Sequence, residues 1–356
     1  MTSRRIGVLT FHRCINYGSY WQARCLVDGL RQRGHDAVLL NHESREVTWA
    51  EWRCAFQPLL PERTARADYR LYAKKARKFL AAFDQLPQSR SFPLNDPAVM
   101  EPQELVIVGS DEVWNLTHPW YGGRPIFYGE GLKAERVVSY AASFGNYDAT
   151  AGLDDYWAQK LRGFSAVSVR DENSRQLVRD ATGQDPELVL DPVLQFPPSP
   201  PPAPADAADR PYVVVYGHSL PRWFRERVKS WADTAGYRLV SIGYRNAWAD
   251  EQRVSAGPEE FAQLIAHAAA VVTNFFHGCV FALINNKPFA CVPSAYRFNK
   301  LRDLTAGVGA QRHLVQEDTP SEELVSLLDQ PLDRRIGENI EAMRRTSNRY
   351  LDHVLA

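Results

Sequence analysis

The hydrophobic positions of this chain fall in short continuous runs rather than in strict alternation with polar ones. Runs rich in valine, isoleucine and leucine occupy residues 6–11, 37–40, 105–108, 137–142, 166–169, 188–190, 212–216, 239–242, 271–273 and 289–292. A strand that is covered on both faces is apolar throughout, so these runs predict the buried parallel strands of an α/β protein.

Segments with a helical pattern lie between many of these runs. They occupy residues 19–33, 153–162, 172–181, 224–235 and 258–268. Strands that alternate with helices in this way predict a doubly wound α/β architecture, in which helices cover both faces of a parallel sheet.

A proline-rich segment at residues 197–210 separates two such halves and predicts a stiff, extended linker. With about 100–200 residues per domain, a chain of 356 residues should form two domains. We therefore expect two Rossmann-like domains facing across a cleft. The expected boundaries are 1–196 (with a helical insertion at about 45–100), 197–210 (linker), 211–320, and 321–356 (a helical tail that could cross back onto the first half).

Within the expected insertion, residues 62–83 predict a basic amphipathic helix. Basic residues recur every four positions and aromatic residues fall on another face: Arg66, Arg70, Lys74 and Lys78 against Tyr69, Tyr72, Phe79 and Phe83. One interpretation is contact with an anionic membrane surface or with a lipid-phosphate-linked substrate. The alternative is an ordinary solvated helix that packs on the first domain.

Composition narrows the class of protein. Lys+Arg and Asp+Glu both number 42, so the balance of charge argues against bulk nucleic-acid binding. The five cysteines form no C-x-x-C pair, which favours reduced thiols over a disulfide framework or a zinc site. The N-terminal apolar run is too short for a signal sequence or a membrane span. We expect a cytoplasmic protein, with the inner face of the membrane as an alternative location because of residues 62–83.

Polar and small residues follow most of the predicted strands, at the edge where open α/β sheets bind ligands. These segments are 12–18, 109–115, 143–145, 170–171, 217–219, 243–245 and 274–278. In the last of them, His277 and Gly278 come between a strand and the helix expected at 279–286. The start of a helix attracts anions through its unpaired amide groups and its dipole. The alternative is a core histidine packed beside Phe275 and Phe276.

Other candidates also have two interpretations. Arg170 can hold a carboxylate or phosphate through two parallel hydrogen bonds, or it can form a salt bridge with Asp171 or Glu172. Trp114 can stack on a sugar or lie in the core. Side chains of the adjacent Asp111 and Glu112 tend to point apart, which disfavours a metal site. No phosphate loop, dinucleotide turn, nucleophile elbow or H-E-x-x-H motif is present.

Six ordered segments together resemble the polysaccharide pyruvyl transferase family. They read INYG at 15–18, VGSDEVWN at 108–115, SYAASFG at 139–145, SVRD at 168–171, LDP at 190–192, and FHG at 276–278 with KP at 287–288. The resemblance extends over roughly residues 6 to 300. It implies a fold like that of the two-domain B-type glycosyltransferases, with the site in the interdomain cleft.

The resemblance also implies a reaction. Phosphoenolpyruvate would be the donor, with no further cofactor, and two hydroxyls of a sugar in a cell-surface or exported glycan precursor would be the acceptor. A pyruvate ketal would form and phosphate would leave. His277, Arg170 and Asp111 would act in catalysis. The residues expected to bind substrates are Asn16, Tyr17, Gly18, Ser110, Trp114, Ser143, His218, Arg245, Asn274 and Gly278.

One position departs from the family pattern. Many members carry an arginine two residues before this histidine, and Phe275 stands there in this chain. We expect Arg245, Arg297 or Lys300 to supply the missing charge, unless the donor has changed. The alternative functions are a sugar-nucleotide-dependent glycosyltransferase and a non-catalytic glycan-binding relative.

Overall fold

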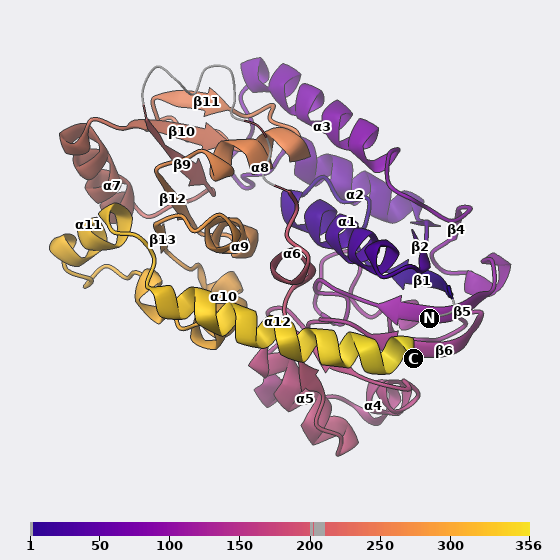
Figure 1. Ribbon diagram of the computed structural model, residues 1–356. Helices are drawn as coiled ribbons and strands as arrows, with labels where there is room; N and C mark the ends of the chain where they lie inside the picture. The colour runs from indigo at the N-terminus through magenta and orange to yellow at the C-terminus, as the bar shows by residue number, and fades with distance from the viewer. Residues whose placement is uncertain (1–2, 200–201, 203–210) are drawn as a thin grey trace. The chain divides into compact units, whose positions relative to one another are not determined.

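The computed structural model describes residues 3–199, 202 and 211–356 (Figure 1), so most of the predicted linker at 197–210 lies outside the described residues. The chain divides into two compact units, each with its own parallel sheet. Unit 1 comprises Met1–Glu51, Gln85–Pro197 and Ile340–Ala356, and unit 2 comprises Trp52–Asp84 and Pro198–Asn339.

Unit 1 is built on a four-stranded parallel sheet in the order β2-β1-β5-β6. Its strands are β1 (Arg5–Leu9), β2 (Asp36–Leu39), β5 (Gln103–Val108) and β6 (Ala134–Ser139). Two short parallel pairs accompany it: β3 (His42–Glu43) with β4 (Phe92–Pro93), and β7 (Ser168–Val169) with β8 (Glu187–Leu188). The helices are α1 (Tyr17–Gln32), α4 (Asp155–Arg162), α5 (Glu172–Thr182) and α6 (Pro192–Gln195), while α2 (Arg45–Phe56) runs into unit 2.

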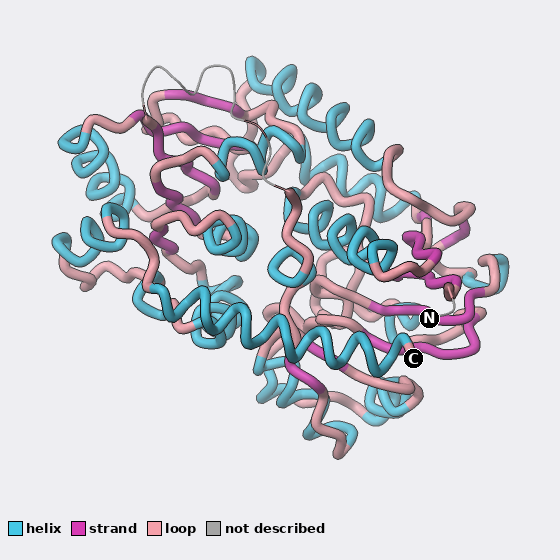
Figure 2. The backbone as a smooth tube through the Cα atoms, in the orientation of Figure 1, coloured by secondary structure: helices cyan, strands magenta, loops and turns pink. Residues whose placement is uncertain are grey.

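Unit 2 contains a five-stranded parallel sheet in the order β11-β10-β9-β12-β13. Its strands are β9 (Tyr212–Tyr216), β10 (Arg238–Ile242), β11 (Glu251–Arg253), β12 (Ala270–Thr273) and β13 (Phe289–Cys291). Helices α7 (Arg222–Ala235), α8 (Pro258–Ala266) and α9 (Phe276–Ile284) lie beside this sheet (Figure 2). The other helices are α3 (Tyr69–Phe83), α10 (Phe298–Val308) and α11 (Ser321–Asp329).

Each of the ten predicted strand runs contains an observed strand, and the α/β class is confirmed. In the sheet of unit 2, every residue of the adjacent strands β9 and β12 is buried, as expected for strands that are covered on both faces. The strands that the pattern missed are β3, β4 and β11. They are two or three residues long and hold mostly polar side chains, so they carry no hydrophobic run.

The chain passes between the units at places that the predicted boundaries did not include. Residues 52–84 belong to unit 2, although the prediction assigned them to the first domain. They are held there by ion pairs: Asp68, directly before α3, pairs with Arg245, and Lys78 of α3 pairs with Glu260. The final helix, α12 (Arg334–Leu355), begins in unit 2 and ends in unit 1.

The C-terminal part of α12 is bonded to the core of unit 1. Ser347 Oγ accepts the Leu190 amide at 2.9 Å, and the Tyr350 hydroxyl donates to the Ser139 carbonyl at 2.6 Å. Among the residues that the structure describes, no helix combines the length and the apolar character needed to cross a bilayer. The basic side chains Arg70 and Lys74 of α3 are exposed, and contact with a membrane surface stays a prediction.

Candidate functional site

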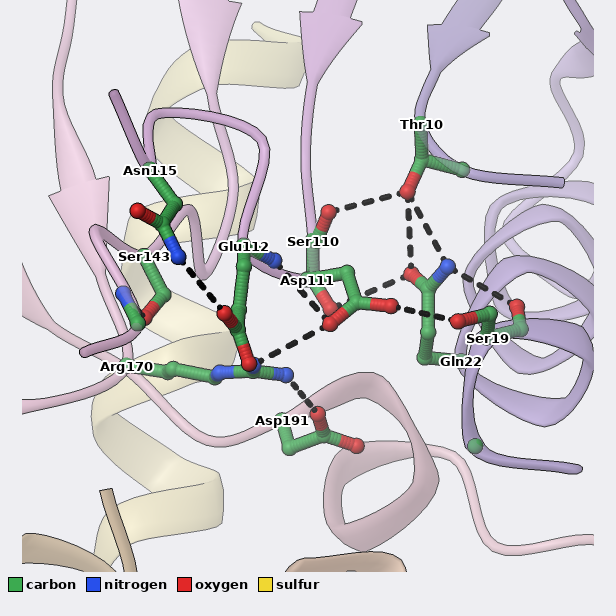
Figure 3. Close-up of polar contacts among 12 residues, drawn as sticks. Thr10, Ser19, Gln22, Ser110, Asp111, Glu112, Asn115, Ser143, Arg170 and Asp191 are labelled. Atoms are coloured by element: carbon green, nitrogen blue, oxygen red, sulfur yellow. Dashed lines mark hydrogen bonds and ion pairs between the residues drawn. The ribbon is translucent and has the colours of Figure 1, made fainter. Parts of the chain in front are cut away.

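In unit 1, polar residues from several strand ends form one hydrogen-bonded network (Figure 3). Strand β5 ends at Val108, and the turn that follows puts Asp111 in the left-handed backbone region with φ of 73°. The Asp111 carboxylate accepts a hydrogen bond from Ser19 Oγ at 2.8 Å and pairs with the Arg170 guanidinium at 3.3 Å. The network therefore fixes the position of this carboxylate from two sides.

Arg170 is buried and held by two carboxylates. Its second partner is Asp191, at 2.9 Å from Nη1, and both partners are far along the chain from it. Burial alone would lower the pKa of Arg170, but the charges of Asp111 and Asp191 raise it. The salt bridge considered at the sequence level, with Asp171 or Glu172, is not the one formed. Because its charge is already matched within unit 1, Arg170 positions Asp111 instead of forming an anion site alone.

Ser110 and Ser143 were predicted to bind substrates, and both are completely buried. Ser110 Oγ donates to Gln22 Oε1 at 3.1 Å. Ser143 Oγ donates to Asp171 Oδ2 at 2.6 Å and accepts the Gly145 amide at 2.9 Å. These bonds shape the loops after β5 and β6, and substrate contact by either serine stays a prediction.

The predicted segment at 16–18 forms the start of α1. Asn16 is its N-cap, and its side-chain oxygen accepts the amides of Gly18 at 2.8 Å and Ser19 at 3.2 Å. Tyr17 is buried. The cap orients the first turn of α1 and with it Ser19, whose hydroxyl reaches Asp111. The segment thus serves the site by positioning Ser19.

Trp114 lies in the hydrophobic core, which is the alternative to stacking on a sugar that the sequence also allowed. It is fully buried, its indole N–H donates to the Phe127 carbonyl at 2.8 Å, and its ring packs 5.6 Å from that of Phe144. Asp111 and Glu112 turn to different partners, since Glu112 accepts from Asn115 Nδ2 at 2.9 Å. Across the described residues, no group of three or more histidine, cysteine and carboxylate side chains is placed to hold a metal ion.

In unit 2, the loops after β9, β10 and β12 bring three aromatic side chains together with Tyr216, the last residue of β9. The His218 ring lies 5.2 Å from Tyr244 and 5.4 Å from Phe275, and Tyr244 lies 5.3 Å from Phe275. Tyr216 packs behind them, 4.8 Å from Phe275. Asn274 Nδ2 donates to the His218 carbonyl at 2.7 Å and so ties two of the loops together.

Two cations lie against this aromatic cluster. Lys75 of α3 donates to the Gly243 carbonyl at 3.1 Å, and its Nζ is 4.7 Å from the centre of the Tyr244 ring. The Arg297 guanidinium carbon is 4.4 Å from the centre of the Phe275 ring. Burial lowers the pKa of Lys75 to about 7. Burial also lowers the pKa of His218 to about 4, with added repulsion from Arg297 and Lys75.

His277 and Gly278 occupy the first turn of α9, directly after β12. His277 is buried, and its ring lies 5.1 Å from that of Phe276. A Cβ atom at Gly278 would lie only 2.2 Å from Thr273 Oγ1, and the Gly278 amide already donates to the Phe275 carbonyl at 3.0 Å. Gly278 is therefore needed for the packing of α9 on β12, and contact of its backbone with a ligand stays a prediction.

Arg245 was predicted as a binding residue and as a replacement for the missing arginine, but its charge is neutralised. Its Nε donates to Asp68 Oδ2 at 2.5 Å, its Nη2 bonds to the other carboxylate oxygen, and this hydrogen bonding raises its pKa. Arg297 differs, because in the described part of the chain it donates only to Ser294 Oγ, at 3.2 Å, and meets no carboxylate. Arg297 thus supplies an unneutralised cation at this turn.

The sequence profile described as polysaccharide pyruvyl transferase matches residues 16–296 of the chain. The chain belongs to the polysaccharide pyruvyl transferase family. No curated protein matches the sequence.

Solved structures place this family member in a known fold. Arabidopsis thaliana UGT89C1 in complex with UDP-L-rhamnose is 11% identical, with a TM-score of 0.52, and the match covers 100% of this chain and 99% of that one. A UDP-N-acetylglucosamine 2-epimerase is 12% identical, with a TM-score of 0.52 and coverage of 100% and 96%. S. aureus MnaA with UDP is 12% identical, with a TM-score of 0.50 and coverage of 99% and 96%. These similarities show that the fold resembles that of the B-type glycosyltransferases.

Sequence reasoning missed Lys75 as a site residue of this pyruvyl transferase family member. Lys75 lies within the basic segment 62–83, yet it is buried whereas Lys74 is exposed. The sequence does contain a signal: Lys75 follows Tyr72 by three positions and precedes Phe79 by four, so it occupies the apolar stripe of the helix. A lysine at such a position is a candidate for a buried role.

Proposed function

We propose that this protein transfers the pyruvyl group of phosphoenolpyruvate to two hydroxyls of a sugar in a glycan precursor, forming a pyruvate ketal and releasing phosphate. The observation that carries the proposal is the strand-to-helix turn of unit 2, where His277 lies in the first turn of α9 and Arg297 stacks on the nearby Phe275. A donor that bears a carboxylate and a phosphate needs cations and N–H donors of this kind. Membership of the pyruvyl transferase family supports the same donor.

The chemistry proceeds in an addition followed by a substitution. One sugar hydroxyl bonds to the central carbon of phosphoenolpyruvate while the methylene carbon gains a proton and becomes a methyl group. The second hydroxyl then bonds to the same carbon, the bond to the phosphate oxygen breaks, and the second hydroxyl proton leaves with phosphate. His277 donates the proton to the methylene carbon, because histidine is the side chain best suited to proton transfer near neutral pH.

In unit 1, Asp111 accepts the proton of the attacking hydroxyl. The two bonds that hold its carboxylate, from Ser19 Oγ at 2.8 Å and Arg170 at 3.3 Å, suit a general base that must keep one orientation. Arg170 and Ser19 act here as positioning residues. A sugar-nucleotide donor is the second candidate, because two of the structurally similar proteins hold UDP or UDP-L-rhamnose.

The test is turnover of phosphoenolpyruvate with a panel of sugars and nucleotide- or lipid-linked sugars as acceptors. We expect phosphate release that depends on the acceptor, together with a ketal product detected by mass spectrometry. His277→Asn should lower kcat by about 10²–10⁴-fold, while His267→Asn, at an exposed position of the same unit, should leave it unchanged.

Two results would contradict this proposal. Turnover of a nucleoside diphosphate sugar, with no consumption of phosphoenolpyruvate, would assign the protein to the second candidate. Unchanged kcat in a correctly folded His277→Asn protein would remove His277 from the chemistry.

A further inference from the structure

The cationic and aromatic side chains of unit 2 converge at one edge of its sheet. His218, Tyr244 and Phe275 come from the loops that follow β9, β10 and β12, so all three lie at carboxyl ends of parallel strands. This is the edge at which open α/β sheets bind ligands. All three side chains are half-buried, so part of the surface of each remains accessible.

Arg297 reaches this edge from the turn η5 (Ala295–Arg297). The guanidinium group of Arg297 lies over the Phe275 ring. The centre of that ring is 4.8 Å from the centre of the Tyr216 ring and 5.3 Å from that of Tyr244. Ser294 Oγ takes one hydrogen bond, and no carboxylate among the described residues neutralises the charge. A guanidinium that is oriented but not neutralised retains donors in the fork geometry that suits phosphate.

Lys75 reaches the same edge from α3. Its ammonium group lies over the Tyr244 ring, and the groups that face it are Cys54 of α2, Tyr244 after β10 and His218 after β9. Burying an ammonium group costs free energy, and a bound anion would offset that cost. The pKa of Lys75, lowered by burial to about 7, makes its charge respond to a nearby anion at neutral pH.

The His218 ring packs beside both of the rings that contact these cations, with its centre 5.2 Å from that of Tyr244 and 5.4 Å from that of Phe275. Burial, Arg297 and Lys75 hold its pKa at about 4, so it is neutral at physiological pH. A neutral imidazole donates one N–H without adding a third charge. The three residues thus combine two positive charges with a neutral donor.

We propose that Lys75, His218 and Arg297 bind the phosphate group of a small phosphorylated substrate at the carboxyl edge of the second sheet. The proposal rests on the proposed function only for the identity of that substrate, which would be phosphoenolpyruvate. The same anion chemistry would also suit the diphosphate of a nucleotide-linked sugar. Phe275 is then the platform that orients Arg297.

The test measures anion binding to the full chain by calorimetry, with sulfate, phosphoenolpyruvate and UDP as separate ligands. Arg297→Met and Lys75→Met should each weaken the binding of sulfate, and of whichever of phosphoenolpyruvate and UDP binds the wild type, about 10- to 100-fold. The matched control is Lys74→Met, which removes an exposed positive charge from the neighbouring position of the same helix and should change affinity less than about twofold. Circular dichroism confirms that each variant is folded, and Lys75→Arg should restore most of the affinity.

Sulfate also tests the role of Lys75 through pH, because its own charge is constant near neutrality. Only the protonated amine attracts the anion, so affinity should fall by up to about tenfold per unit as pH rises above about 7. Binding above that pH should take up a proton. Both effects should be absent in Lys75→Met, since His218, with its pKa of about 4, does not titrate in this range.

The possible outcomes distinguish a failure of the phosphate site from a failure of the proposed reaction. If phosphoenolpyruvate binds and reacts with the same KM in Arg297→Met and Lys75→Met, the phosphate site is wrong and the proposed function stands. If sulfate or UDP binding depends on these residues but phosphoenolpyruvate is not consumed, the site stands and the donor assignment fails. If the wild-type protein binds none of the three anions at millimolar concentrations, the site is wrong.

Discussion

Arg170 pairs with two carboxylates, so a substitution at this position should lower the stability of unit 1. In Arg170→Met, Asp111 and Asp191 would face each other without a counter-charge, and the Asp191 side chain is 1% exposed. Breaking a buried ion pair at one partner typically costs about 3–5 kcal/mol of stability. We expect the urea-induced unfolding of unit 1 to shift by this amount.

The control for Arg170→Met is Arg175→Met on α5, which breaks an exposed pair with Asp185. Surface pairs contribute about 0–1 kcal/mol, so this variant should unfold almost like the wild type. Equal, small losses in both variants would show that the charges of Asp111 and Asp191 are relieved in another way. Because of the expected instability, activity loss in Arg170→Met is no proof of donor binding.

If the phosphate site that we propose exists, Phe275 would contribute to it by orienting Arg297, in place of the arginine expected at its own position. A cation over an aromatic ring gains about 0.5–2 kcal/mol, depending on its exposure, and Arg297 occupies that position over Phe275. The substitution therefore exchanges an arginine in the turn for a ring that holds an arginine from elsewhere. The sequence named Arg297 among three possible replacements, but only the contacts distinguish it from the neutralised Arg245.

Spacing along the chain predicts which residues follow the strands but not the direction in which each side chain points. Ser110, Ser143 and Trp114 follow strands as ligand-binding residues do, yet they bond to other parts of unit 1. A polar residue at a strand end can satisfy the protein's own polar groups or a ligand's, and both uses leave the same sequence pattern. Burial decides between them, and burial depends on contacts that are distant in sequence.

The start of helix α1 gives a prediction that separates capping from substrate binding. Asn16 accepts two amides of the first turn, and replacing such a cap by alanine typically costs about 0.5–2 kcal/mol. Asn16→Ala should therefore lower the unfolding free energy by about 1 kcal/mol, whereas Asn16→Ser keeps an acceptor and should lose little. If the serine variant is as stable as the wild type but turns over much more slowly, Asn16 also contacts a substrate.

Helices and strands with a strong periodic signal were predictable, and their partners were not. The amphipathic pattern of 62–83 predicted helix α3, because its buried positions recur with helical spacing. The pattern shows that one face must be covered but carries no information about what covers it. The ion pair of Lys78 with Glu260 and the bond from Lys75 to Gly243 assign that face to unit 2.

The two units exchange segments of chain, so the order of the sequence is not the order of the folding units. A proline-rich segment marks one boundary because its composition differs from that of its surroundings. The crossings at residues 51–52, 84–85 and 339–340 have no such composition. They are set by which core offers a complementary surface, a property of the folded units that local composition does not encode.

The C-terminal helix therefore provides a test of the units as cooperative structures. Removing residues 340–356 would delete four buried apolar side chains, Ile340, Leu351, Val354 and Leu355, from unit 1. Each contributes about 1.5–3 kcal/mol, which together is comparable to the whole stability of a domain, about 5–15 kcal/mol. Hydrogen–deuterium exchange should show lost protection in β1, β5 and β6 and retained protection in β9, β10 and β12.

Tyr350→Phe provides the milder counterpart, since it removes only the hydrogen bond to the Ser139 carbonyl and should cost about 1 kcal/mol. Tyr350→Phe should reduce the protection of unit 1 slightly, and removal of residues 340–356 should abolish it. Loss of protection confined to unit 1 in both proteins would show that α12 stabilises the sheet of that unit. Equal loss of protection in both sheets would instead mean that the two units unfold as one. In that case the two units would be compact regions of the chain but would not unfold independently.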